Sequence, residues 1–136
     1  MGLSRGTGRA HIARAALEAI ALSTMEVVET MAADADIPVN ELRVDGGAAV
    51  NNLLMQIQSD IIDTNVVRPK VTETTALGAA YLSGLATGFW ENIDQLKEQW
   101  QVDRKFEPSD KKGNYKKVIT NWKKAVERSK GWYDEH

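Results

Sequence analysis

Residues 42–60 read LRVDGGAAVNNLLMQIQSD, and this stretch decides the fold class. Its first four residues, Leu42 to Asp45, predict a short β-strand, which the glycine pair Gly46 and Gly47 ends. From Ala49 onward the apolar residues recur at helical spacing, which predicts a helix from Ala49 to Asp63. A strand that passes through a glycine turn directly into a helix is typical of α/β proteins.

The flanking segments extend this pattern in both directions. Upstream, Arg9–Ala33 predicts one long helix, because it is rich in alanine and lacks internal glycine and proline. Its apolar residues occupy most of the circumference, which predicts burial against a sheet. Downstream, Asn65–Arg68 predicts a second strand, closed by Pro69. A third helix is expected over Thr75–Ala86, with residues 72–75 as its cap and Gly88 at its end.

The order helix, strand, helix, strand, helix predicts an α/β fold with two parallel strands, since strands joined by a crossover helix run in the same direction. A two-stranded sheet is marginally stable in water. We therefore expect this sheet to gain strands, either from a partner or from a segment upstream of residue 1.

The last third of the chain carries most of its positive charge. Residues 104–132 contain 10 Lys and Arg against 3 Asp and Glu, whereas residues 1–103 contain 7 against 14. After a short helix over 92–101 and an extended connection, we expect a helix from about Asp110 to Trp132. Its lysines alternate with apolar residues, which predicts an amphipathic helix with one solvated face. Binding of an anionic partner such as nucleic acid stays open as the alternative.

Composition excludes several classes of protein. The 136 residues are 43% hydrophobic and 26% charged, as expected for one soluble domain. Cysteine is absent, which excludes disulfides and thiolate zinc sites. The sequence contains no apolar run near the roughly 18 residues that a membrane span needs. We therefore expect a cytoplasmic protein without a membrane span.

The glycine turn is the best candidate for a binding site. Gly46 and Gly47 remove side chains that would block a flat base or a phosphate, and a helix start offers free N–H groups. Asn51 and Asn52 add amide groups one turn later. Asp45 stands at the carboxyl end of a strand, where α/β sites form. The structural alternative is a tight turn that Asp45 orients, with Asn51 facing solvent.

No catalytic or metal-binding set is evident elsewhere. Only two histidines occur, and His136 ends the chain. We expect His11 to be a structural or capping residue near the start of the first long helix rather than a base, because no partner residue is apparent. The small residues Ala76, Gly78, Ala79 and Ala80 favour close packing of the third helix over catalysis.

Several linked motifs resemble the C-terminal part of the FGGY family of carbohydrate kinases, and in particular its bacterial members that phosphorylate glycerol. The resemblance covers the whole chain and rests on Gly2-Leu3, His11–Glu18, Leu42–Gly47, Asn51–Gln56, Gln58–Asp60, Pro69, Glu73–Tyr81 and Gly88–Trp90. It implies part of an actin-like, ribonuclease-H-like ATPase domain. Three antiparallel strands that precede the helix at Arg9 in the family are absent. Residues 1–90 would belong to the nucleotide-binding domain, and residues 91–136 would form a helical extension packed on it.

The resemblance also implies a function. Members of the family bind ATP in a cleft between two domains, and Gly47 and Asn51 would contact ADP or ATP, with Gly46 and Asp45 shaping the turn. The reaction would transfer the γ-phosphoryl group of Mg-ATP, with its Mg²⁺, to glycerol and give sn-glycerol 3-phosphate. The general base and the glycerol-binding residues would lie upstream, so this chain alone should be inactive.

The intact enzyme would be a cytoplasmic homo-oligomer that binds no nucleic acid. Two alternatives stay open. One is a kinase of the same family that acts on another polyol or sugar. The other is a non-catalytic interaction module with a basic tail helix.

Overall fold

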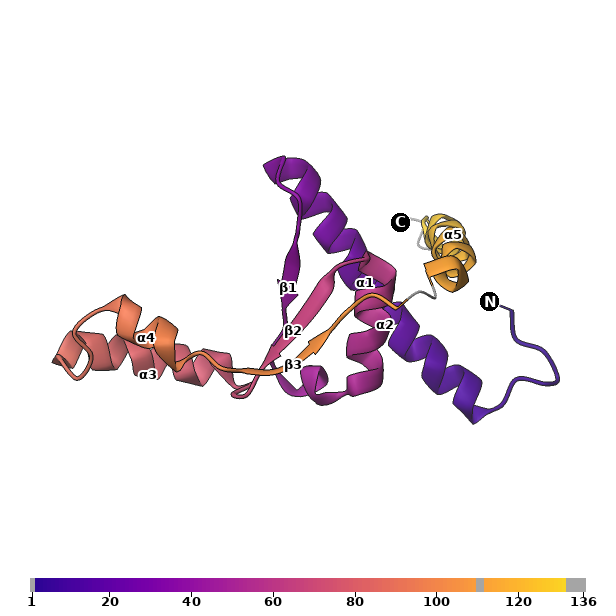
Figure 1. Ribbon diagram of the computed structural model, residues 1–136. Coiled ribbons are helices and arrows are strands. Elements are labelled where there is room, and N and C mark those ends of the chain that lie inside the picture. Colours follow the sequence, from indigo (N-terminus) through magenta and orange to yellow (C-terminus); the bar gives the residue numbers. More distant parts are fainter. Residues whose placement is uncertain (1, 110–111, 132–136) are drawn as a thin grey trace, which may run out of the picture.

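The computed structural model describes residues 2–109 and 112–131, so the predicted helix ends at Asp110 and Trp132, as well as His136, lie outside the described residues. Figure 1 shows the order of elements. They are α1 (Arg9–Ala35), β1 (Glu41–Arg43), the 3-10 turn η1 (Gly47–Val50), α2 (Asn52–Ile62), β2 (Asn65–Pro69), α3 (Thr74–Thr87), α4 (Ile93–Gln99), β3 (Val102–Phe106) and α5 (Lys112–Ser129). The predicted helix–strand alternation is confirmed.

The sheet of the described residues has three strands in the order β1-β2-β3. β1 and β2 are parallel, with Leu42 opposite Val66, which confirms the prediction from the crossover helix. β3 is antiparallel to β2, with Phe106 opposite Val66. The expected extended connection after α4 is confirmed, but it forms a third strand of the sheet, whereas the sequence predicted two strands. The sequence did not predict β3 as a strand because this segment is mostly polar. An edge strand that buries only Phe106 shows no alternation of apolar and polar residues.

Helix α2 forms the centre of the packed body. It contacts α1 on one side and the strands β2 and β3 on the other. The core residues come from all of these elements and are Ala21, Leu22, Met25, Ala49, Leu54, Met55, Ile57, Ile61, Val66, Phe106 and Tyr115. Buried polar groups fix the neighbours to α2: Gln58 Nε2 donates to Ala21 O at 3.1 Å, and Ser59 Oγ lies 3.1 Å from Phe106 O.

Helix α1 is less buried than its composition predicts. Only Ala21, Leu22 and Met25 are buried, in one stripe against α2. The expected burial of α1 against a sheet is wrong for the described residues, since several large apolar side chains are half exposed or more, namely Ile12, Ile20, Val27 and Met31. The sequence of α1 is apolar over most of the helix circumference, whereas the described chain packs against only one side of the helix.

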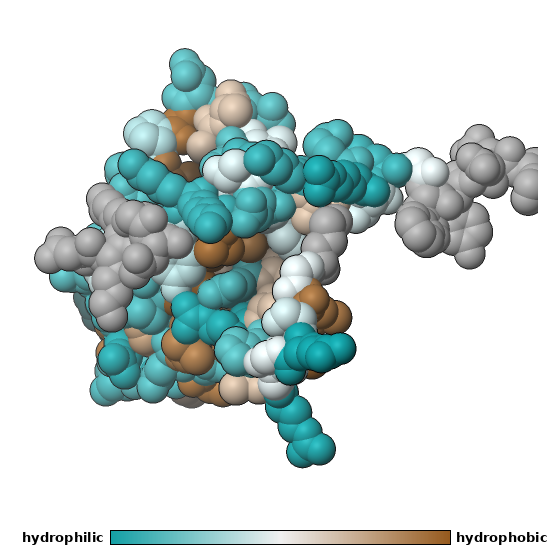
Figure 2. Space-filling view, turned by 90° about the vertical axis from the view of Figure 1, so that its right-hand side faces the viewer, coloured by the Kyte–Doolittle hydropathy of each residue, from teal (hydrophilic) through white to brown (hydrophobic). Residues whose placement is uncertain are grey.

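The C-terminal helix α5 is amphipathic, as predicted. Tyr115 is buried, Val118, Ile119 and Trp122 are partly buried, and the lysines from residue 116 onward are exposed. Arg14 Nη2 donates to Tyr115 Oη at 2.7 Å, and Trp122 Nε1 donates to Glu26 Oε1 at 2.9 Å, which fasten α5 to α1. The side of the molecule on which α5 lies is mostly hydrophilic, with smaller hydrophobic areas between (Figure 2).

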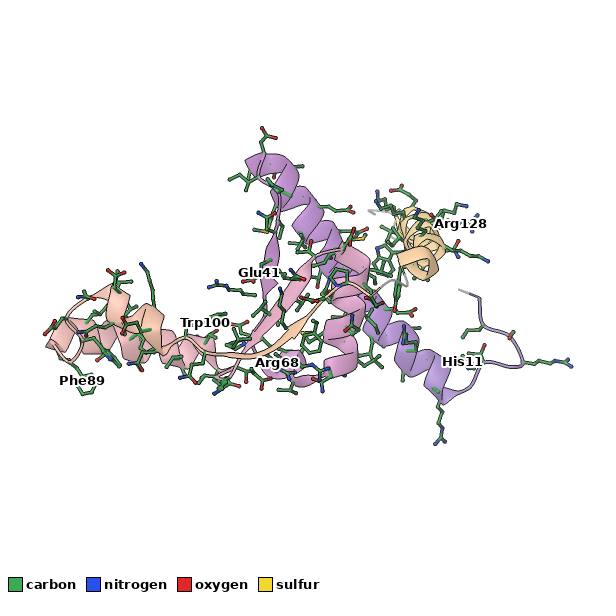
Figure 3. All side chains as sticks on the ribbon, in the orientation of Figure 1. His11, Glu41, Arg68, Phe89, Trp100 and Arg128 are labelled. Atoms are coloured by element: carbon green, nitrogen blue, oxygen red, sulfur yellow. The ribbon has the colours of Figure 1, made fainter. Side chains whose placement is uncertain are left out.

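Helices α3 and α4 form an arm, residues 74–99, that extends away from the α1–α2 body (Figure 1). Neither helix contains a buried residue. Gly88, at φ 77°, ends α3 in the left-handed conformation, and the Trp90 ring then meets Tyr81 edge to face at 5.2 Å. Trp100 lies at the base of the arm (Figure 3), and the Arg43 guanidinium carbon lies 4.3 Å from the centre of its ring.

Candidate functional site: the glycine turn

The turn between β1 and α2 contains two glycines with different requirements. Gly46 has φ 76° and ψ 177°, a conformation that is essentially restricted to glycine. Gly47 begins η1, and a Cβ atom built on it would meet no atom of the described chain within 4 Å. The fold therefore explains Gly46, whereas nothing in the described residues requires the absence of a side chain at Gly47.

The start of the turn is tied to the segment that leads into α3. The Gly46 amide donates to Thr72 O at 2.8 Å, and the Thr74 hydroxyl donates to the Asp45 carboxylate. Asp45 therefore links the start of the turn to the first residue of α3, a contact 29 residues away in the sequence rather than the local hydrogen bonds of its structural alternative. The N-cap of α3 is Glu73, within the predicted range 72–75, but its side chain makes no capping hydrogen bond.

Asn51 separates η1 from α2. Its backbone is extended, with φ −78° and ψ 100°, and its Oδ1 accepts from the amides of Leu53 and Leu54, each at 3.1 Å. The expected continuous helix from Ala49 is therefore wrong, because a 3-10 turn ends at Val50 and α2 begins one residue after Asn51. This exposed side chain is an N-cap whose oxygen is occupied, while its NH₂ group retains two donors.

Arg68 contributes to the turn from β2, and the sequence interpretation missed it. Its Nη1 donates to Ala49 O at 2.8 Å and to Asn52 Oδ1 at 3.0 Å. Its Nε and Nη2 each lie 2.7 Å from Asp103 Oδ2 on β3. The sequence signal that could have pointed to Arg68 was its position as a charged residue inside an otherwise apolar strand. Figure 3 shows Arg68 beside β2 and β3.

A hollow of about 280 Å³ lies beside the turn, between α1 and β1. Asp45, Ala48 and Ala49 line it from the turn, and Ile20 and Leu42 line it from α1 and β1. β1 is an edge strand of the described sheet. The candidate turn thus stands at the border of an open, partly apolar side of the body.

The other chemical expectations concern His11, metals and membranes. His11 Nδ1 accepts from the Gly8 amide at 3.1 Å, which confirms the predicted capping role at the start of α1. Across residues 2–109 and 112–131, no group of three or more His, Cys, Asp or Glu side chains is arranged to hold a metal ion. Within the same ranges, no helix has the length and apolarity needed to cross a membrane.

Comparisons with known proteins agree with the motif pattern. Residues 1–87 match the model of the C-terminal domain of the FGGY family of carbohydrate kinases. The chain is 56% identical over 135 residues to a glycerol kinase of Oleidesulfovibrio alaskensis, covering 99% of this chain and 27% of that protein. The chain therefore spans about a quarter of the length of the curated relatives that it matches.

Solved structures give the fold. A glycerol kinase of Plasmodium falciparum with ADP superposes with a TM-score of 0.81 at 39% identity, over 98% of this chain and 27% of that chain. A xylulose kinase of Lactobacillus acidophilus has the same TM-score and coverage at 20% identity, which supports the fold alone. The predicted partial actin-like, ribonuclease-H-like ATPase domain is confirmed. The chain belongs to the FGGY family of carbohydrate kinases.

Proposed function

We propose that this chain is the adenosine-side part of a kinase that transfers the γ-phosphoryl group of Mg-ATP to glycerol, giving sn-glycerol 3-phosphate. The identity of more than half to glycerol kinases over nearly the whole chain favours glycerol over another polyol or sugar. It also weighs against a non-catalytic module. The packing of the apolar face of α5 on α1 supports the amphipathic-helix interpretation of the tail over a nucleic-acid partner.

The observation that carries the nucleotide site is the open space at Gly47. A glycine at an ordinary φ with no neighbour within 4 Å is not needed by the described fold. A ligand that approaches the backbone closely would need it. The glycerol kinase of Plasmodium falciparum was solved with ADP, which indicates the ligand class. We assign Gly47 and Asn51 to contact with ADP or ATP, and Gly46 to the shape of the turn.

Asn51 can perform its structural and ligand-binding roles together. Its Oδ1 is occupied by the two amides of α2, and the NH₂ group leaves donors for an acceptor on the nucleotide. The exposed position of the side chain allows such contact.

Catalysis needs the rest of the kinase. Phosphoryl transfer depends on positioning and on charge neutralisation around the reacting phosphate. The described residues do not form a site for Mg²⁺ by themselves. We propose that Mg²⁺ binds with the ATP phosphates and that glycerol binds mainly upstream. We also propose, from the family resemblance alone, that the intact enzyme is a cytoplasmic homo-oligomer.

Complementation tests this proposal. The chain is mixed with the upstream portion of a glycerol kinase, and ADP release is followed with glycerol. We expect activity only from the mixture. A folded, docked complex without activity would contradict the proposed function.

The same assay tests the site. Asn51→Ala would remove both the proposed nucleotide contact and the N-cap of α2. Loss of an N-cap alone destabilises a protein by about 0.5–2 kcal/mol. Asn51→Ser keeps a capping oxygen but removes the NH₂ donors. We expect Asn51→Ser to raise the KM for ATP and to leave the KM for glycerol unchanged. Equal increases in both constants would show that Asn51 is not on the nucleotide side.

A further inference from the structure

Arg68 connects the strands to the residues on both sides of Asn51. Its side chain is only 12% exposed, and its guanidinium reaches Ala49 O and Asn52 Oδ1, which flank Asn51 in the sequence. We propose that Arg68 is a positioning residue for the nucleotide, because it fixes the break between η1 and α2. This inference rests on the proposed function of the glycine turn.

The hydrogen-bond pattern explains why the break needs an outside donor. In a continuous α-helix, the Ala49 carbonyl would accept from the Leu53 amide. That amide donates instead to Asn51 Oδ1. Ala49 is 1% exposed, and its carbonyl receives the Arg68 Nη1 donor at 2.8 Å. Without Arg68, a carbonyl beside the Asn51 cap would lose this partner, and the turn would gain freedom to adopt other conformations.

The geometry requires an arginine. The planar guanidinium directs Nη1 toward the turn while Nε and Nη2 face Asp103. The Arg68 guanidinium carbon also lies 5.5 Å from the centre of the Phe106 ring. A lysine would keep the positive charge, but its single ammonium could not serve the turn and Asp103 in the same arrangement. The ion pair with Asp103 therefore orients the Arg68 guanidinium, and the guanidinium in turn holds the turn in place.

Arg104 provides a matched control. It is the cross-strand partner of Arg68, and its guanidinium carbon lies 4.8 Å from the centre of the same Phe106 ring. In the described part of the chain, its guanidinium has no hydrogen bond to the turn. Arg104→Lys therefore makes the same chemical change on the same aromatic ring without disturbing η1 or α2.

The test compares steady-state kinetics of the full-length kinase that contains this segment, as Arg68→Lys and Arg104→Lys. For Arg68→Lys we expect the KM for ATP to rise about tenfold, with kcat and the KM for glycerol within about twofold of the parent. Arg104→Lys should change none of the three constants by more than about twofold. Equal rises in both KM values, or an unchanged KM for ATP, would overturn the inference.

Two further variants keep the outcome decisive. If Arg68→Lys does not fold, Asp103→Asn should give a smaller rise in the KM for ATP alone, and no rise would count against the inference. In Arg68→Ala, added guanidinium ion should lower the KM for ATP toward the parent value, an effect that general destabilisation would not produce.

If Asn51→Ser raises the KM for ATP and the Arg68 variants do not, only the positioning role fails. If neither does, the assignment of the nucleotide site fails as well.

Discussion

The two glycines of the turn should respond in opposite ways to the same added methyl group. At Gly46, φ 76° and ψ 177° place an alanine in a conformation that costs about 1–3 kcal/mol. At Gly47, a Cβ would meet nothing within 4 Å in the described chain. Gly47→Ala should therefore stabilise the chain by about 0.4–1 kcal/mol, because it restricts the unfolded state.

Urea unfolding of the 136-residue chain, followed by tryptophan fluorescence, measures both effects. With an m-value of about 2 kcal/mol/M, a loss of about 2 kcal/mol lowers the midpoint by about 1 M. Gly46→Ala should show such a decrease, and Gly47→Ala a slight increase. A Gly46→Ala midpoint equal to that of the parent would refute the described turn conformation.

The nucleotide response should follow the reverse order. If a nucleotide approaches Gly47 closely, the methyl group of Gly47→Ala should raise the KM for ATP in the full-length kinase by about tenfold, the equivalent of about 1.4 kcal/mol. This variant would thus be more stable and bind ATP less tightly. An unchanged KM for ATP would refute the argument that a ligand explains the glycine.

Two other predictions concern the body that supports the turn. Phe106→Ala should lower the free energy of unfolding by about 3–5 kcal/mol in urea unfolding, because Phe106 is 2% exposed and anchors β3. A loss below about 1 kcal/mol would contradict its place in the core. Burial raises the pKa of the Tyr115 phenol above its usual value near 10, despite the opposing effect of the Arg14 charge. The folded state therefore holds this proton more tightly, so its contribution is complete below about pH 10 and is lost as the pH rises through the folded-state pKa. Urea midpoints measured across this range should fall in the parent and less in Tyr115→Phe, and equal declines would refute the assignment.

Local sequence signals predicted the elements that have a regular apolar pattern or a clear end signal. α2 and α5 have clear apolar stripes, and Gly88 and Pro69 mark the ends of α3 and β2. β3 could not be predicted in this way, because it is stabilised by pairing with β2 and by one buried residue, Phe106. The partner strand determines such an edge element, and single-strand patterns carry little of that information.

The candidate site divides along the same line. Gly46, Gly47 and Asn51 could be recognised because they are adjacent in the sequence and form one local turn. Arg68 and Asp103 could not, because they reach the turn only after β2 and β3 have paired. The sequence therefore predicted the candidate turn, but not the side chains that hold it in position.

The support of the glycine turn extends beyond the segment that matches the family model. The family model matches residues 1–87, whereas the contacts that hold the turn continue from Arg68 to Asp103 on β3. β3 also supplies Phe106, over which Arg68 lies. A segment that ended at residue 87 would keep Gly47, Asn51 and Arg68, but Arg68 would lose its acidic partner and the ring beneath it. The polar strand β3 is thus part of the support of the turn, even though none of its residues belongs to the turn itself.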